Sequence, residues 1–490
     1  MRVVHCRPVF LETDGVCREN GAFVGLGGLF MERDHASLKG WTSRWVFILA
    51  ATGSAVGLGN IWKFPYITGE YGGGAFVLMY LLIILLVGIP VMVAEVLMGR
   101  RGGLSPINTM KKLAGQAEVS SRWKWLGYLG ALAGFLILTF YSVIAGWSLY
   151  YIVALPTQLA GADAETVSAT FDGLLASPVI MLGCHSLFML LTAGVVLQGV
   201  HRGLQRAAEI MMPALFVMLL VLLGYATSSG GFDQALTFMF SVDFSKLSAD
   251  AVLVAMGHSF FTLSLGLGAI MAYGAYMPRE VTNREGQKRP VSIGSTVLTI
   301  AFLDTLVAIV AGLCIFPVVF ANGLEPAAGP GLLFKTLPLA FAHMPGGLWF
   351  GTLFFVLVLF AAWSSSISLL EPLVAWFVES GWTRTKATLV LALAAWLIGI
   401  GSVLSFNVWS DATLFGKTVF DSLDFLTTNV MLPLGGLLIA VFAGWIMKDS
   451  HVRKELNMKS FRFYLGWRVA VRIIAPLAIL AVFARGIGLF

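Results

Sequence analysis

The sequence predicts an all-α integral membrane protein with about eleven transmembrane helices, of which the first and the sixth are broken near their centres. Of the 490 residues, 58% are hydrophobic and only 12% are charged, and the mean hydropathy is strongly positive. This composition is far from that of a soluble domain. Apolar stretches long enough to cross a bilayer recur along the whole chain, and glycine and polar residues interrupt two of them.

No segment between the apolar stretches is long enough for a separate soluble domain. The expected spans cover residues 42–69, 74–100, 123–156, 177–198, 204–226, 250–275, 292–320, 347–379, 384–404, 419–447 and 466–489. The longest gaps, 227–249 and 321–346, contain Gly, Pro and short amphipathic runs. We therefore expect external loops or lids in these two gaps.

Lysine and arginine are concentrated in alternate connections between the spans. The inner connections hold Arg100, Arg101, Lys111, Lys112, Arg122, Lys124, Arg202, Arg206, Arg279, Arg284, Lys288, Arg289, Arg384, Lys386 and a basic cluster from Lys448 to Arg472. The outer connections hold only Lys246, Lys335 and Lys417. This asymmetry predicts a multi-pass protein of the cell inner membrane with a cytoplasmic N-terminus. The net charge of +6 then reflects basic faces that meet anionic lipid, with no nucleic-acid signature.

The chain lacks the motifs of the common enzyme classes. It has no P-loop, zinc-protease or nucleophile-elbow motif, and its histidines are isolated from one another. The four cysteines show no metal-like spacing. We therefore expect that the protein is not an enzyme.

The centre of the first span is a poor continuous helix. Gly53, Gly57, Gly59 and Asn60 interrupt its apolar pattern, and Pro65 follows. A break there would free backbone carbonyls, which protein, water or ions must then satisfy inside a bilayer. Close helix packing through small residues is the alternative explanation of these glycines.

The sixth span has a similar interruption. Between Phe261 and Gly268 it carries Thr262, Ser264 and Gly266 among leucines. Broken helices at corresponding positions of two halves are the best sequence indication of a transporter binding site. This pairing favours a break in both spans over simple close packing.

The residues around these interruptions resemble the signature of the neurotransmitter:sodium symporter family. The matching runs are Ala55–Tyr66, Glu70–Phe76, Gly88–Pro90 with Glu95, Met98–Arg100, Tyr141, Trp147, Phe261–Gly268, Ser364–Ser366 and Asp424–Phe425. The resemblance implies the LeuT fold, in which two five-helix repeats of opposite topology enclose the substrate near the bilayer midplane. It implies a transporter core over residues 38–447, with repeat one at about 41–226 and repeat two at about 250–447. We expect 1–37 to be a disordered or mis-started extension, with Met31 as an alternative start, and 448–490 to form a cytoplasmic loop and the eleventh helix.

The resemblance also implies sodium sites made of oxygen ligands, which a hard cation prefers. For the first site it indicates the Ala55 carbonyl, the Asn60 side chain, the Thr262 carbonyl and hydroxyl, and Asp304. For the second it indicates the carbonyls of Gly53, Val56 and Ala361 and the hydroxyls of Ser364 and Ser365.

The implied substrate site lies between the two breaks. A substrate carboxylate is expected near Gly57, Gly59 and the Tyr141 hydroxyl, because the N-terminal ends of half-helices favour anions. An amino group is expected near the carbonyls around Ala55, Phe261, Thr262 and Ser264. The pocket for the side chain would be lined by Ile137, Phe261, Leu267, Ser365 and Leu369.

Two positions depart from relatives with other requirements. Amine-transporting relatives carry an aspartate where this chain has Gly57, so the negative charge must come from the substrate, as in an amino acid. The positions that surround chloride in chloride-dependent relatives are Tyr80, His258, Thr262, Asp304 and Ala308 here. A fixed carboxylate at Asp304 could replace the anion, so we expect chloride independence. The alternative, a helix-start residue near water, conflicts with the position of Asp304 well inside its apolar span.

Lys63 and Asp424 match the outer gate pair of the family, in which two charges face each other across a vestibule. Their attraction would increase as water leaves the vestibule. For the remaining membrane acids, Glu95 and Glu371, the sequence leaves both structural and transport roles open.

On the inner side, Trp41 with a nearby basic residue, Lys39 or Arg44, is expected to pair with Glu379. The usual arginine position of the family reads Leu38 here, which is a departure from the family pattern.

Taken together, the residues and the resemblance predict sodium-coupled import of a neutral, hydrophobic or aromatic L-amino acid by alternating access. One or two Na⁺ ions would enter per cycle, and chloride would not be required. The sequence leaves open an amino-acid sensor, a channel, or a sodium-independent exchanger of the same fold. It does not identify the amino acid.

Overall fold

The computed structural model describes residues 16–19, 22–25, 40–282, 286–326, 331–458 and 460–486. The chain divides into two units, Met1–Lys39 and Gly40–Phe490. In the first unit, strands β1 (Val16–Glu19) and β2 (Ala22–Gly25) pair in antiparallel orientation. The expected extension over 1–37, with its alternative start at Met31, otherwise lies outside the described residues.

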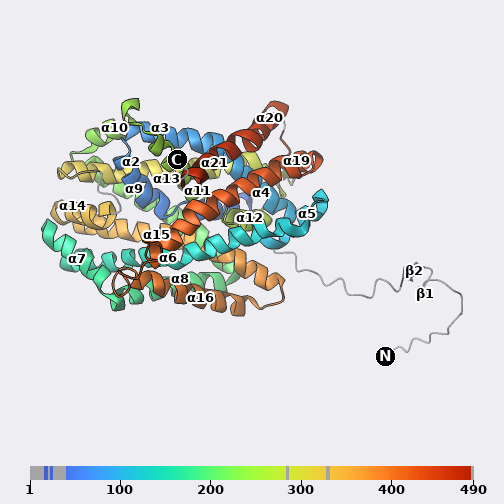
Figure 1. The fold of residues 1–490 in the computed structure, drawn as a ribbon, viewed down its shortest axis with the longest axis horizontal. Coiled ribbons are helices and arrows are strands. Elements are labelled where there is room, and N and C mark those ends of the chain that lie inside the picture. Colours follow the sequence, from blue (N-terminus) through green and yellow to red (C-terminus); the bar gives the residue numbers. More distant parts are fainter. Residues whose placement is uncertain are drawn as a thin grey trace. The chain divides into compact units, whose positions relative to one another are not determined.

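The first half of the second unit contains five spans. Their segments are α1 (Arg44–Ala55), η2 (Gly59–Lys63) and α2 (Phe64–Glu70); α3 (Gly74–Ile83), η3 (Ile84–Gly88) and α4 (Ile89–Gly102); α6 (Lys124–Gln158); α8 (Pro178–Leu197); and η5 (Val200–Gln205) with α9 (Arg206–Thr227). Figure 1 shows α6 and α8 side by side with α16 of the second half, and these three helices pack on one another.

The second half repeats this succession of spans, and a further span ends the unit. The segments are α11 (Ala249–Thr262) and α12 (Ala269–Ala275); α13 (Ile293–Ala321); α15 (Gly347–Glu379); α16 (Arg384–Leu404); and α17 (Val419–Asp424), η8 (Phe425–Met431), α18 (Leu432–Val441) and η9 (Phe442–Ile446). The last span consists of α20 (Phe461–Val469), η10 (Ala470–Ile474) and α21 (Ala475–Gly486).

Short elements connect the spans. They are α5 (Pro106–Ala117), η4 (Ser121–Trp123), α7 (Ala164–Ala176), α10 (Phe232–Phe240), η6 (Phe244–Lys246), the antiparallel strands β3 (Glu280–Thr282) and β4 (Lys288–Pro290), η7 (Leu332–Thr336), α14 (Leu337–His343) and α19 (Asp449–Leu456). The gaps 227–249 and 321–346, predicted to be loops or lids, therefore contain short helices.

The prediction of a broken first span is confirmed. Among the described residues, nine helices are long and apolar enough to cross a membrane without interruption, and the pair formed by Arg44–Ala55 and Gly59–Glu70 is bent by 52°. The sixth span is interrupted between Thr262 and Ala269, so each of its pieces is short. Counting each interrupted pair as one span gives the predicted number of about eleven.

Helix α6 lies close to the second break and to α15 because it carries glycines on that side. A Cβ atom at Gly130 would lie 2.9 Å from the Gly268 nitrogen, and one at Gly134 would lie 3.4 Å from the Leu369 carbonyl oxygen. Small residues allow backbones to approach in this way. The long helix α6 thereby places its middle section beside the residues that interrupt the sixth span.

Candidate functional site

A cavity of about 30 Å³ lies between the two broken spans, α6 and α15. Its lining includes every residue that the sequence analysis assigned to the substrate, together with Ser54 and Leu58. These residues are Ser54, Ala55, Gly57, Leu58, Gly59, Ile137, Tyr141, Phe261, Thr262, Ser264, Leu267, Ser365 and Leu369. The structure thus brings the predicted residues together, and their contact with a substrate stays a prediction.

The break in the first span is stabilised by side chains that replace helical hydrogen bonds. Helix α1 ends where Val56 adopts an extended conformation. The Gly57 N–H then donates to Asn60 Oδ1 at 3.0 Å, and the Leu58 N–H donates to the Tyr141 hydroxyl at 3.3 Å. Gly57 has no room for a side chain, because a Cβ atom would lie 2.6 Å from Ser365 Oγ.

The break in the sixth span depends on positive φ angles and on a buried carboxylate. Ser264, Gly266 and Gly268 have φ angles of 53°, 78° and 70°. These angles suit glycine and are unusual for serine. The Gly266 N–H donates to Glu95 Oε2 at 3.1 Å, and the Ser264 hydroxyl donates to the Ser54 carbonyl at 2.8 Å. The sequence left a structural role and a transport role open for Glu95, and the structure shows its carboxylate in a structural hydrogen bond.

Three of the residues predicted for the first sodium site meet at Asp304, which is fully buried. The Asn60 amide donates to Asp304 Oδ1 at 2.8 Å and to its carbonyl at 3.0 Å. The Thr262 hydroxyl lies 3.1 and 3.2 Å from the two carboxylate oxygens. Ala55, the fourth, lines the adjoining cavity.

The Asp304 carboxylate has no cationic partner within ion-pair distance among the described residues. Burying an unpaired carboxylate is costly, and two neutral hydrogen-bonding partners offset only part of that cost. A small cation coordinated by these oxygens would neutralise the charge. The residues present therefore fit a Na⁺ site.

The residues predicted for the second sodium site lie where the end of α1 meets α15. Ser365 Oγ lies 3.4, 3.3 and 3.1 Å from the carbonyl oxygens of Gly53, Ser54 and Val56. Ser364 Oγ donates to the Ala361 carbonyl at 3.0 Å, and its Cβ lies 3.3 Å from the position that a Cβ of Gly53 would occupy.

Several carbonyl oxygens therefore crowd one hydroxyl at this point. A serine hydroxyl has one proton to donate, so it satisfies one carbonyl at a time. The carbonyls at the C-terminal end of α1 also carry the negative end of the helix dipole. This arrangement suits a cation as well.

The predicted outer gate residues, Lys63 and Asp424, are not in contact. Lys63 Nζ lies over the ring of Phe261, 5.0 Å from its centroid, and Asp424 Oδ1 accepts from the Thr428 hydroxyl at 2.9 Å. Each charge thus has a local partner, a ring face for the lysine and a hydroxyl of its own helix for the aspartate.

Among the described residues, Arg44 and Glu379 of the predicted inner pair are not in contact. Glu379 accepts from the Ser105 N–H at 2.6 Å, from the Ser105 hydroxyl, and from Asn108 at 2.7 Å. Its carboxylate thereby caps the N-terminus of α5, where exposed N–H groups favour a negative charge. The other candidate partner, Lys39, lies outside the described residues.

Trp41 and Arg44 hold the N-terminal end of α1 to other helices. The Trp41 indole donates to the Tyr273 carbonyl at 3.3 Å, and its ring packs edge-on against Tyr273 and Tyr276. Arg44 donates to Thr296 Oγ1 at 3.0 Å and to Ser295 Oγ at 3.2 Å. The N-terminal end of α1 is therefore tied to α12 and α13.

Sequence reasoning missed a buried network next to Trp41. The fully buried Glu371 of α15 accepts hydrogen bonds from Arg384 at 2.5 and 3.2 Å and from the Tyr276 hydroxyl at 3.0 Å. Arg384 also donates to the Val196 carbonyl at 2.8 Å. An acid in one span followed by an arginine at the start of the next was a signal that could have revealed this pair.

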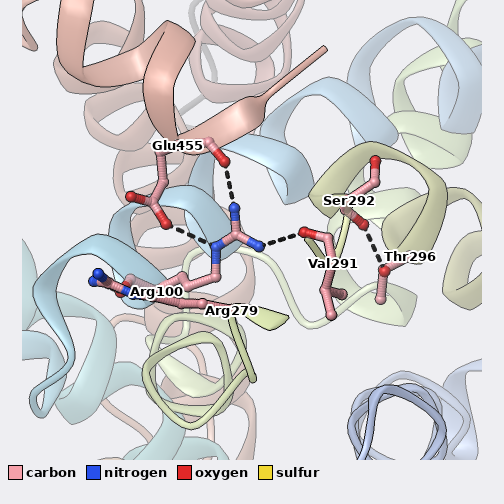
Figure 2. A network of polar contacts seen from close by, with 6 residues as sticks. All are labelled: Arg100, Arg279, Val291, Ser292, Thr296 and Glu455. Atoms are coloured by element: carbon pink, nitrogen blue, oxygen red, sulfur yellow. Dashed lines mark hydrogen bonds and ion pairs between the residues drawn. The ribbon is translucent and has the colours of Figure 1, made fainter. Parts of the chain in front are cut away.

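A second unpredicted network lies at the end of α4 (Figure 2). Arg100, only 6% exposed, donates to Glu455 Oε1 at 2.7 Å, to the Glu455 carbonyl, and to the Val291 carbonyl at 2.7 Å. Val291 directly precedes Ser292, the residue that caps α13. Arg100 thus joins α4 and the start of α13 to α19.

Several known proteins are similar to this chain over most of its length. The profile of the family described as "Sodium:neurotransmitter symporter family" matches residues 39–170 and 180–490. An uncharacterised sodium-dependent transporter of Bacillus subtilis is 39% identical over 458 residues, which cover 92% of this chain and 98% of the relative. One of Haemophilus influenzae is 32% identical, with 92% and 99% covered. The crystal structure of MhsT in complex with L-phenylalanine matches with a TM-score of 0.82 and 44% identity, covering 91% of this chain and 99% of that one.

Proposed function

The chain belongs to the sodium:neurotransmitter symporter family of sodium-dependent transporters and is not an enzyme, and from this premise we propose that it imports a neutral, hydrophobic or aromatic L-amino acid by alternating access without requiring chloride. The observation that carries the proposal is the cavity between the broken spans, whose lining combines backbone and hydroxyl groups with apolar side chains.

The polar part of this lining suits the carboxylate and amino groups that all amino acids share. Leu58 and Gly59 contribute to it where the second half of the first span begins, and the Tyr141 hydroxyl lies beside them. Amide groups at a helix start favour an anion. Because none of the lining residues is acidic, a monoamine would lack a counter-charge there, whereas a zwitterion brings its own.

The apolar part of the lining suits an uncharged, hydrophobic side chain. Ile137, Phe261, Leu267 and Leu369 contribute to it. A charged side chain would lose its hydration there without gaining a partner. The complex of MhsT with L-phenylalanine supports the same substrate class, since that protein is similar to this chain over nearly its whole length.

We propose that Na⁺ binds at Asp304 with Ala55, Asn60 and Thr262, and at Ser365 with Gly53, Val56, Ala361 and Ser364. The fixed carboxylate of Asp304 would supply the negative charge that chloride supplies elsewhere. One Na⁺ moving inward through about 100 mV contributes about 2.3 kcal/mol, or roughly 50-fold accumulation of substrate. One or two ions per cycle are enough to concentrate a nutrient across the inner membrane, with the N-terminus of the transporter in the cytoplasm.

Uptake of labelled L-phenylalanine or L-leucine into proteoliposomes under an imposed Na⁺ gradient tests the proposal. We expect accumulation that requires Na⁺ and persists when gluconate replaces chloride. Saturable binding without accumulation would indicate a sensor, and accumulation without Na⁺ would indicate an exchanger. A competition panel of the amino acids would then identify the substrate.

The sodium sites have a separate test. Asp304→Ala and Ser365→Ala should each shift the Na⁺ dependence of substrate binding to higher concentration. Ser366→Ala is a matched control, because Ser366 is also buried but donates to the Trp363 carbonyl and does not line the cavity. An unchanged Na⁺ dependence in both site variants would refute these assignments.

A further inference from the structure

A second cavity opens between the N-terminal part of α6, α15 and α18, and we call it the α6–α18 groove. Its volume is about 790 Å³, and its apolar walls are Trp125, Leu129, Leu132, Leu373, Leu434 and Leu438. Trp125 and Leu132 are 63% and 47% exposed. Such a groove on a membrane-spanning protein faces hydrocarbon chains.

One end of the groove carries interfacial residues. Ser120, Arg122, Trp123 and Tyr128 line it at the start of α6. Tryptophan and tyrosine are enriched at the boundary between hydrocarbon and headgroups. The distribution of Lys and Arg assigns this end of α6 to the cytoplasmic side, so the groove lies at the level of the inner leaflet.

Arg122 supplies an unused positive charge at this level. It is exposed, and among the described residues no acceptor lies within hydrogen-bonding or ion-pair distance of its guanidinium. Lys124 adds a second cation close by in the chain, while the nearest acid in the sequence, Glu118, is already paired with Lys448 at 2.5 Å. A guanidinium binds phosphate well, and a basic pocket between spans on this side suits an anionic headgroup.

The groove also adjoins the helices that form the central cavity. Leu373 lies one helical turn beyond Leu369, which lines that cavity, and α6 carries both Leu132 in the groove and Ile137 in the cavity. An occupant of the groove would therefore contact both α6 and α15 near the substrate.

We propose that the α6–α18 groove binds one anionic phospholipid, with an acyl chain along the leucine wall and the phosphate at Arg122. The site depends on the groove and on Arg122, and it does not depend on which amino acid is transported.

Native mass spectrometry of the full-length protein tests this site, with phosphatidylglycerol and phosphatidylcholine of the same acyl chains as probes. Wild type should retain phosphatidylglycerol more tightly. Arg122→Gln should weaken phosphatidylglycerol binding about fivefold, the effect of about 1 kcal/mol for one basic residue near the membrane surface. Arg202→Gln is the matched control, because Arg202 is also exposed and basic but lies outside the groove.

A second pair of variants tests the apolar wall. Leu132→Trp should fill the groove and weaken binding of both lipids, whereas Leu187→Trp changes a similarly exposed leucine (49%) on α8 and should have no effect. Equal retention of the two lipids by wild type, or equal losses in Arg122→Gln and Arg202→Gln, would overturn the proposal. So would a dimer that dissociates on Leu132→Trp, because a second copy of the chain would then cover the groove.

Discussion

Replacing Gly57 by alanine tests whether the centre of the proposed site has the geometry described above. The added Cβ would lie 2.6 Å from Ser365 Oγ and 2.9 Å from the Tyr141 hydroxyl oxygen, so both groups would have to move. These hydroxyls now bond to the Val56 carbonyl at 3.1 Å and to the Leu58 N–H at 3.3 Å. At about 1 kcal/mol for each bond, the loss of both corresponds to roughly 30-fold weaker substrate binding.

Equilibrium binding of labelled L-phenylalanine at saturating Na⁺ measures this loss. Gly183→Ala is the control, because no atom lies within 4 Å of the Cβ position there. If Gly57→Ala is folded and its Kd stays within threefold of the wild-type value, then Ser365 and Tyr141 do not organise the binding site as we argue.

Three further predictions concern the rest of the molecule. Gly99→Ala should lower the melting temperature strongly, because the added Cβ would lie 2.1 Å from the Met271 carbonyl oxygen. Gly115→Ala in α5 is the control, because its added Cβ would meet no neighbouring group within 4 Å. This control should be neutral or stabilising by up to about 1 kcal/mol. Arg384→Leu should destabilise the protein by about 3–5 kcal/mol because it leaves the buried Glu371 unpaired, and adding Glu371→Gln should recover most of the loss in thermal denaturation. Lys335 lowers the pKa of the exposed Asp172 by a hydrogen bond to its carboxylate. The difference in free energy of unfolding between wild type and Asp172→Asn should therefore be present above pH ~4 and vanish as the pH falls through the lowered pKa. A difference that grows on acidification would contradict this pairing.

The parts of the site that sequence predicts well lie in continuous runs. Within Ala55–Pro65, the glycines that break the helix and Asn60, which replaces its hydrogen bonds, are close neighbours, and the same holds for Phe261–Gly268. A local pattern therefore carries both the break and the groups exposed by it. The apolar spans are predictable for a similar reason, since length and hydropathy are local properties.

The contacts that the sequence did not predict involve side chains whose partners are determined by tertiary packing. Glu379 was predicted to pair with Lys39 or Arg44, but among the described residues it accepts hydrogen bonds from the start of α5, where N–H groups lack helical partners. Helix α5 itself was not predicted, because it is too short and too polar to span a membrane. Its buried side, which includes Met110 and Leu113, becomes apparent only in the folded structure. Arg100 counted only as one of many inner basic residues, although its buried pair with Glu455 joins segments far apart in the chain.

These corrections change which contacts must break when the site opens inward. The N-terminal end of α1 is bonded to α12 through Trp41 and to α13 through Arg44, whereas Glu379 of α15 is bonded to α5. Motion of α1 and α12 together relative to α15 would therefore leave the Trp41 bond intact. It would instead strain the hydrogen bond from Tyr276 to Glu371 on the inner side and the bonds of Ser365 to α1 at the proposed sodium site. Because both sets of bonds join the same two groups of helices, we expect that occupancy of the proposed sodium site by a cation and closure of the proposed inner side favour each other.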